Sequence, residues 1–246
     1  MEKRINTLLI VTALMAAVFA VCAYHFRNDE HDSVLSEDRE ILLCEYIDID
    51  LLRLDVTVIP YEGENIRVVY NNELPLDISL GDNKLSIEES DKFVISLFTG
   101  SRTDFGLYLY LPKEYYREVT ICTGSGSVRV GGIDSELLTV ITNSGDIISE
   151  NSRSLSLLTT GSGNITLDCD VPVEKTMIQS RTGNAQIIFP AETAASVNFE
   201  TISGELHTDL ISGEVFGGGE YSFYGGNRPI YAALETGTLT ISEKRQ

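Results

Sequence analysis

A short phrase recurs through the second half of the chain and constrains the fold more than any other feature. T-N-S-G-D-I at residues 142–147 is followed eighteen residues later by T-G-S-G-N-I at 160–165. With one glycine taken from each copy, the phrase is centred on Gly126, Gly145, Gly163, Gly183, Gly204 and Gly237. The first five glycines are 18 to 21 residues apart, and the last interval is 33 residues. A period near twenty is typical of stacked structural repeats.

Columns of similar residues flank these glycines. Five residues before them stand Ile121, Val140, Leu158, Ile178, Phe199 and Ala232, and two residues after them stand Val128, Ile147, Ile165, Ala185, Leu206 and Leu239. A small hydroxyl residue stands three before the glycine in five copies: Thr123, Thr142, Thr160, Ser180 and Thr201. Apolar alternation on both sides of a glycine turn is the pattern of half-buried strands. We expect glycine where the turn needs positive φ, with nearby hydroxyl and amide side chains bonded to the turn backbone.

The sequence therefore predicts an all-β fold, a β-solenoid-like stack of ~20-residue strand–turn–strand coils that form two packed sheets. A single coil cannot bury its apolar face, whereas coils stacked about 4.8 Å apart can. Residues 45–112 also have the pattern of strands, with hairpin chemistry at Gly81-Asp82-Asn83.

The alternation also distinguishes the two outer faces. One residue after each glycine come Ser127, Asp146, Asn164, Asn184, Glu205 and Thr238, which predict a solvated face. The outward positions before the glycines include Cys122, Ile141, Leu157, Met177 and Tyr231, so we expect residues 45–112 or a partner to cover that face. The same parity directs Cys122 outward and Cys169 inward, which disfavours a disulfide between them.

The N-terminus predicts a membrane anchor. Residues 5–26 contain no charged side chain and follow Lys3 and Arg4; at about 1.5 Å per residue they reach about 33 Å, enough to cross a bilayer. Basic residues before the segment and acidic residues after it place the N-terminus in the cytoplasm. We expect a cytoplasmic tail (1–4), a single-pass transmembrane anchor in the cell membrane (5–26), a tether (27–40) and an extracytoplasmic β-repeat domain (41–246). A cleaved signal peptide, with Val21-Cys22-Ala23 as a poor cleavage site, is the alternative.

The formal net charge is −19, which argues against binding to nucleic acid or anionic lipid. It suits cationic peptides, basic proteins or divalent metals, or serves only solubility. Beyond the anchor stand Cys44, Cys122 and Cys169, an odd number that rules out a disulfide scaffold.

The long interval before Gly237 contains a Gly-rich aromatic insertion at 214–229, with Phe216, Tyr221, Phe223 and Tyr224. These aromatic residues either cap the open end of the stack or form a candidate binding loop.

Several strings together carry a resemblance to a known family: I-D-I-D and L-D-V-T-V-I-P, then L-Y-L-Y-L-P-K-E-Y, T-G-S-G-S-V, T-N-S-G-D-I, G-S-G-N-I-T-L and T-I-S-G-E-L. Residues 42–242 resemble the bacterial putative-adhesin family, a β-strand-repeat domain of unknown function. The resemblance implies an envelope binding or sensing module, and it transfers no site residues. The chain departs from the pattern at Thr182-Gly183 and Thr236-Gly237, which lack the serine before glycine.

Residues for catalysis are few. The histidines are His25, His31 and His207, and neither H-E-x-x-H nor a pair of C-x-x-C motifs occurs. A serine triad would need His207, which occupies an outward strand position. Asp146, Asp168, Asp170 and Glu205 are the carboxylates that a glycan-cleaving β-helical enzyme would use, but they share no common position in the repeat. We therefore predict no enzyme activity, no catalytic residues, no metal and no cofactor.

Three functions follow in order of preference. The first is a non-catalytic, membrane-anchored binding module, adhesin-like or envelope-stress sensing, that holds an envelope component, a surface protein or a cationic peptide. The alternative is a structural envelope scaffold that self-associates end to end. The third is a glycan-active β-helical enzyme.

Overall fold

The computed structural model describes residues 36–71, 74–89, 106–169, 176–208, 210, 218–224, 226 and 229–244. Across these ranges every regular element is a β-strand, which confirms the all-β prediction for this part. Within the same ranges no helix is long and apolar enough to cross a membrane. The predicted tail, the anchor and residues 27–35 of the tether lie outside the described residues. Residues 36–40 belong to a strand, so the folded part begins earlier than the predicted boundary at residue 41.

The strands, in chain order, are β1 (Ser36–Ile41), β2 (Tyr46–Leu51), β3 (Asp55–Tyr61), β4 (Ile66–Asn71), β5 (Leu76–Gly81), β6 (Lys84–Glu89), β7 (Gly106–Pro112), β8 (Tyr115–Thr123), β9 (Val128–Val130), β10 (Asp134–Thr142), β11 (Ile147–Glu150), β12 (Arg153–Ser162), β13 (Ile165–Asp168), β14 (Met177–Thr182), β15 (Ala185–Phe189), β16 (Ala195–Thr208), β17 (Gly219–Phe223) and β18 (Pro229–Glu243).

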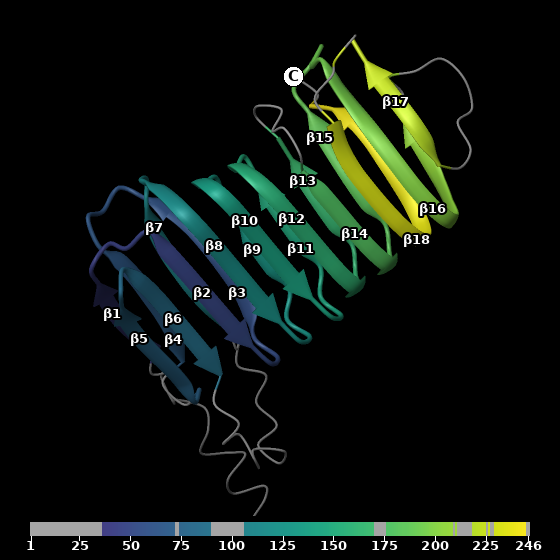
Figure 1. Ribbon diagram of the computed structural model, residues 1–246. Helices are drawn as coiled ribbons and strands as arrows, with labels where there is room; N and C mark the ends of the chain where they lie inside the picture. Colours follow the sequence, from purple (N-terminus) through teal and green to yellow (C-terminus); the bar gives the residue numbers. More distant parts are fainter. Residues whose placement is uncertain are drawn as a thin grey trace, which may run out of the picture. The chain divides into compact units, whose positions relative to one another are not determined.

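The strands before and after each turn form two layers (Figure 1). The first layer consists of parallel neighbouring strands in the order β2, β8, β10, β12 and β14. The second layer consists of parallel neighbouring strands in the order β3, β9, β11, β13 and β15. The residues of the two predicted apolar columns are at most 3% exposed and belong to one hydrophobic core. The layers are not separate sheets as predicted, because β16 and β18 continue through the turn and join all strands into one 18-stranded sheet.

The buried hydroxyl of the repeat connects each turn to the preceding coil. Thr142 Oγ1 accepts a hydrogen bond from the Gly145 N–H at 3.0 Å and donates one to the Gly126 carbonyl at 3.1 Å. Thr160 donates in the same way to the carbonyl of Gly145, at 3.0 Å. The predicted bonding of hydroxyl side chains to the turn backbone is confirmed.

The turn glycines are needed mainly because neighbouring turns lie close together, and not mainly because of positive φ as the sequence predicted. Of the six, Gly183 and Gly237 have positive φ, at 156° and 126°. A Cβ on Gly145 would lie 1.9 Å from the Gly126 carbonyl oxygen, and a Cβ on Gly163 would lie 2.2 Å from the Gly145 carbonyl oxygen. Glycine recurs because successive turns approach too closely for any side chain between them.

A second ladder follows the outer edge of the turns, on the face predicted to be solvated. Asp146 Oδ1 accepts a hydrogen bond from the Asn164 N–H at 2.7 Å. Asn164 Oδ1 accepts one from Asn184 at 3.1 Å, and Asn184 Oδ1 accepts one from Thr238 at 2.9 Å. Asp146, Asn164 and Asn184 are exposed, which confirms the solvated face at these positions.

Residues 45–112 extend the stack instead of covering it. β2 and β3 form a coil that pairs with β8 and β9, and β6 and β7 continue the two layers beyond that coil. β5 and β1 are the outermost strands at this end. The described strands of this segment add to the edges of the two layers, so the expectation that they cover the apolar outer face is wrong. Residues 72–73 and 90–105 of the segment lie outside the described residues.

The last coils are stacked in a different order from the sequence. β18 pairs with β14 and β15 on one side and with β16 on the other. Gly237 therefore follows Gly183 in the stack, and Gly204 lies beyond it, whereas the repeat order predicts Gly204 next to Gly183. β17 then runs antiparallel along the outer side of β16.

Candidate functional site

A groove runs along the stack on the outer face of the first layer. One row of its lining residues comes from seven neighbouring strands in register: Asp50, Cys122, Ile141, Thr159, Gln179, Ala233 and Glu200. We call this row the floor. Two residues further along each strand lies the rim row: Leu52, Gly124, Asn143, Gly161, Arg181, Glu235 and Ile202. The groove has a volume of about 980 Å³.

The groove lies where each strand bends into its turn. The residues between floor and rim, such as Thr142 and Thr160, point into the core, so both rows face outward. Because neighbouring strands are about 4.8 Å apart, the six intervals between Asp50 and Glu200 give a groove about 29 Å long. The hydroxyl ladder from Thr123 to Ser180 lies beneath β8, β10, β12 and β14 and fixes the spacing of the floor residues on these strands.

The middle of the groove and the surface beside it are partly apolar. Ile141 is 39% exposed in the floor, and Met177 and Tyr231 are 39% and 43% exposed one row away. Ile202, on the rim at one end, is 81% exposed. Among the described residues no other segment covers this row, so the apolar surface predicted at Cys122, Ile141, Leu157, Met177 and Tyr231 faces outward.

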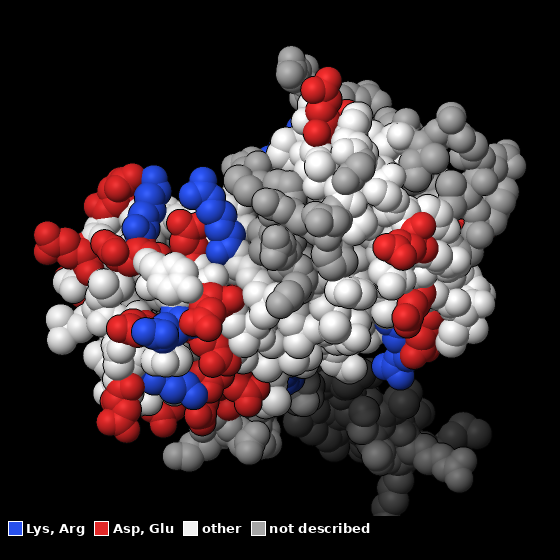
Figure 2. Space-filling view, turned by 45° about the horizontal axis from the view of Figure 1, so that its top comes forward, with Lys and Arg blue, Asp and Glu red and all other residues white. Residues whose placement is uncertain are grey.

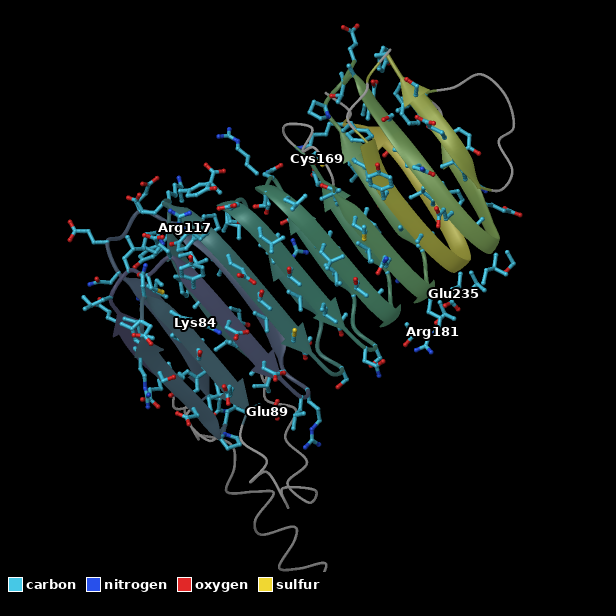
Figure 3. The ribbon with its side chains drawn as sticks, viewed as in Figure 1. Lys84, Glu89, Arg117, Cys169, Arg181 and Glu235 are labelled. Atoms are coloured by element: carbon cyan, nitrogen blue, oxygen red, sulfur yellow. The ribbon has the colours of Figure 1, made fainter. Side chains whose placement is uncertain are left out.

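Charged side chains stand at the ends and on the rim. Asp50 and Glu200 end the floor row, and Arg181 and Glu235 are cross-strand neighbours on the rim (Figure 3). Within the part of the chain that the structure describes, neither Asp50, Glu200 nor Glu235 forms an ion pair. By contrast, Lys84 and Arg117 at the N-terminal end pair with Asp48 and Glu45. Lys, Arg, Asp and Glu are mixed over that end of the molecule (Figure 2).

Cys122 contributes an uncharged thiol to the floor. Its partial burial, and then the carboxylates of Asp50 and Asp48, raise the pKa of the Cys122 thiol. A raised pKa removes the thiolate that a nucleophilic cysteine needs at neutral pH. Cys169 is buried, as parity predicted, and no disulfide joins it to Cys122.

The carboxylates considered for glycan cleavage are not brought together. Asp146 and Glu205 lie four coil steps apart in one row, which is about 19 Å, far more than a pair acting on one glycosidic bond requires. Asp168 pairs with Lys244 at 2.7 Å, and Asp170 lies outside the described residues. His207 is on the second layer, where its Nε2 lies 3.2 Å from a Glu205 carboxylate oxygen.

The aromatic insertion contains both buried and exposed residues. Phe223 is 2% exposed and Tyr221 packs against the core, so these two rings cap the outer side of β16. Tyr224 is 55% exposed, and Phe216 lies outside the described residues. Each of the six turn glycines follows a rim residue by two positions, and a Cβ on any of them would meet a backbone carbonyl oxygen of the neighbouring turn, so their role is structural.

The sequence identified the apolar face but missed the groove itself. Asp50, at one end, lies on β2, which precedes the repeats, and Glu200, at the other end, lies on β16, whose place in the stack differs from its place in the sequence. The spacing of the repeats therefore does not predict that these two residues end one row. The signal that the sequence did contain was an apolar residue at an outward position in five of the six repeats.

Comparisons with known proteins agree with this architecture. The family model described as Toastrack DUF4097 matches residues 44–153 and, in an overlapping second match, 116–229. No curated protein matches the chain. Among solved structures, the chain is similar to a putative cell adhesion protein from Clostridium sporogenes, with a TM-score of 0.50. The two sequences are 14% identical, and the match covers 85% of this chain and 99% of that chain.

A putative adhesin from Bacteroides fragilis is 13% identical, with 86% of this chain and 98% of that chain covered at a TM-score of 0.43. At such identities a structural likeness concerns the fold alone. The family match confirms the resemblance found in the repeated S-G-D-I phrases.

Proposed function

The chain belongs to the Toastrack DUF4097 family, and from this premise we propose that it is a membrane-anchored, non-catalytic β-repeat binding module on the outer side of a bacterial cell membrane. The observation that carries the proposal is the groove. It crosses seven strands, its floor is partly apolar, and Ile141, Met177 and Tyr231 leave apolar surface exposed on and beside it. Exposed apolar surface of this kind marks interaction sites.

The anchoring part of the proposal rests on the sequence. Residues 5–26 are long and apolar enough to span a bilayer, and the charges around them favour an outside location for the β-repeat domain. The name of the Clostridium sporogenes protein, a putative cell adhesion protein, is in keeping with a surface role.

The positions of the polar groups favour binding over catalysis. Asp50 and Glu200 are at opposite ends of the floor, too far apart to act on one bond, and His207 is on the other layer. An end-to-end scaffold is less favoured because the edge strand β1 carries Glu37, Asp38, Arg39 and Glu40, and charges on an edge strand oppose pairing with another strand.

Two matched variants of the full-length protein test the use of the groove. Ile141→Asn changes the groove floor, and Ile148→Asn changes an outward isoleucine of the second layer, on the next strand of the same coil. Full-length protein in nanodiscs of zwitterionic lipid is mixed with labelled envelope fractions, and bound label is counted. We expect Ile141→Asn to lose capture and Ile148→Asn to keep it. Equal capture by both variants would exclude the groove as the binding surface.

Protease treatment of intact cells tests the topology. We expect the β-repeat domain to be digested from outside, together with loss of the signal of an epitope placed after residue 246. Protection of the domain in intact cells, with digestion after lysis, would contradict the outside location.

A further inference from the structure

We infer that the groove takes a cationic amphipathic peptide segment, laid across the strands with a basic residue toward each end and apolar residues between them. The inference rests on the proposed use of the groove as a binding surface and adds the chemical class of its occupant. Four features of the groove support it: its uncharged and partly apolar centre, its acidic ends, the paired backbone of most of its strands and its length.

The floor between the two ends is uncharged and partly apolar. Ile141 and the uncharged Cys122 thiol lie next to each other, Thr159 and Gln179 follow, and Ala233 lies beyond them. Met177 and Tyr231 pair with each other across β14 and β18 and widen this surface on the side away from the rim. Contact with these side chains removes apolar surface of both partners from water.

The ends select for cations. Asp50 closes one end, and Glu200 and Glu235 stand at the other. Asp48, one row from Asp50, already has Lys84 at 2.6 Å, whereas the three groove carboxylates have no basic partner among the described residues. Arg181 is the basic residue of the lining, so three carboxylates and one guanidinium leave the lining with a net negative charge. Nucleic acid and anionic lipid are therefore disfavoured occupants.

The pairing of β16 with β17 ends at Phe199, but the other six floor strands are paired on both sides at the floor. The backbone N–H and C=O groups of those six strands are engaged with neighbouring strands, so a ligand laid across them cannot bind there by adding a strand, and recognition depends on side chains. The about 29 Å between Asp50 and Glu200 corresponds to about nine residues of an extended chain or about nineteen of an α-helix.

A synthetic peptide is the direct probe. It has nineteen residues, with two lysines at each end and an apolar-rich centre, and its partner probe replaces the four lysines by glutamine. Binding to full-length protein in zwitterionic nanodiscs is measured by fluorescence anisotropy at low and high salt, with empty nanodiscs as the blank. We expect the lysine peptide to bind at least about tenfold more tightly than the glutamine peptide, and high salt to reduce that difference.

Two charge variants with the same change in net charge locate the interaction. Asp50→Asn, Glu200→Gln and Glu235→Gln remove the groove carboxylates together, and Glu64→Gln, Glu114→Gln and Glu205→Gln remove three exposed carboxylates outside the groove lining. We expect about a tenfold loss of affinity in the first variant and less than about a threefold loss in the second. Equal losses would show attraction to net charge alone and would overturn the inference.

A steric variant keeps the charge constant. Ala233→Trp fills the floor, and Gln186→Trp places the same ring on an outward position of the second layer. We expect only Ala233→Trp to abolish peptide binding, with both variants unfolding at the same denaturant concentration.

Soluble peptidoglycan fragments serve as the competing probe. The groove is a glycan site if these fragments bind, if Ile141→Asn prevents their binding, and if the lysine peptide does not bind. That outcome keeps the proposed function and rejects the inference, whereas capture of envelope material unaffected by Ile141→Asn rejects both.

Discussion

The hydroxyl of Thr142 donates a hydrogen bond of 3.1 Å to the main-chain carbonyl of Gly126, which lies one coil earlier in the stack. Because the same oxygen accepts the Gly145 N–H, one buried side chain satisfies a donor of its own turn and an acceptor of the neighbouring turn. This arrangement explains why a small hydroxyl recurs three residues before the glycine.

Removing that hydroxyl should destabilise the domain. Thr142→Val keeps the size of the side chain but leaves two buried backbone groups without this partner, and we expect a loss of about 2 to 4 kcal/mol in the free energy of unfolding. Thr139→Val, on the outward side of the same strand, should change it by less than about 0.5 kcal/mol. Urea unfolding measures both. Similar losses for the two variants would mean that the ladder contributes little beyond β-strand packing.

A side chain at a turn glycine should be more damaging than one elsewhere. In Gly145→Ala the new Cβ would have to move away from the Gly126 carbonyl oxygen, 1.9 Å from its ideal position, and both groups are backbone or directly attached to it. We expect a loss of more than about 3 kcal/mol. At Gly81 a Cβ meets nothing within 4 Å, so Gly81→Ala is the control and should leave the thermal midpoint nearly unchanged. A stable Gly145→Ala protein would refute the close approach of the turns.

Cysteine cross-linking should distinguish the observed strand order from the sequential one. Gln186 and Thr240 are register partners on adjacent strands, and His207 lies one strand further. Because disulfides need Cα atoms about 4.4 to 6.8 Å apart, we expect Gln186→Cys with Thr240→Cys to cross-link under mild oxidation. Gln186→Cys with His207→Cys should not. Mass spectrometry of a digest identifies the pair, and the reverse result would restore the order of the repeats in the sequence.

Alkaline pH should weaken the N-terminal end of the stack. Burial, and then the hydrogen bond that its hydroxyl donates to Glu37 at 2.8 Å, raise the pKa of Tyr70 to about 12. An unfolded tyrosine has a pKa of about 10, so the folded state holds this proton more tightly. The resulting stability is complete below about pH 10 and is lost as pH rises toward about 12.

Tyr70→Phe should reduce this pH dependence. Denaturant midpoints measured at about pH 9 and about pH 11.5 should differ less in the variant than in the parent protein. Tyr116 remains in the variant, and because its burial also raises the pKa of that hydroxyl, part of the pH dependence persists. An unchanged difference between the two midpoints would show that Tyr70 does not contribute to it.

The repeat made much of the fold predictable. Ile121, Val140, Leu158 and Ile178 were placed correctly in the core, since each lies at a fixed distance from a glycine that sits in a turn. The stacking position of Gly237 was not predictable. The turns of Gly183, Gly204 and Gly237 have similar sequences, so local pattern alone does not determine which coil pairs with which.

The groove was only half predictable, for a related reason. Ile141 and Met177 could be assigned to an outer face by alternation, which depends on neighbouring residues alone. Whether that face is covered depends on where residues 45–112 pack, and strands that extend a stack have the same alternating pattern as strands that cover it. That Asp50 and Glu200 form the two opposite ends of the groove depends on the order of all the strands between them.

Because the coils are equally spaced, the length of the groove is set by the number of coils. Each coil adds one floor residue and about 4.8 Å to its length, while the buried hydroxyl and the turn glycine keep the spacing the same. Gain or loss of one coil of about twenty residues would lengthen or shorten the groove by one step without changing its depth or its chemistry elsewhere. Duplication or deletion of one repeat would therefore change the length of the peptide segment that the groove can hold, with the packing of the core unchanged.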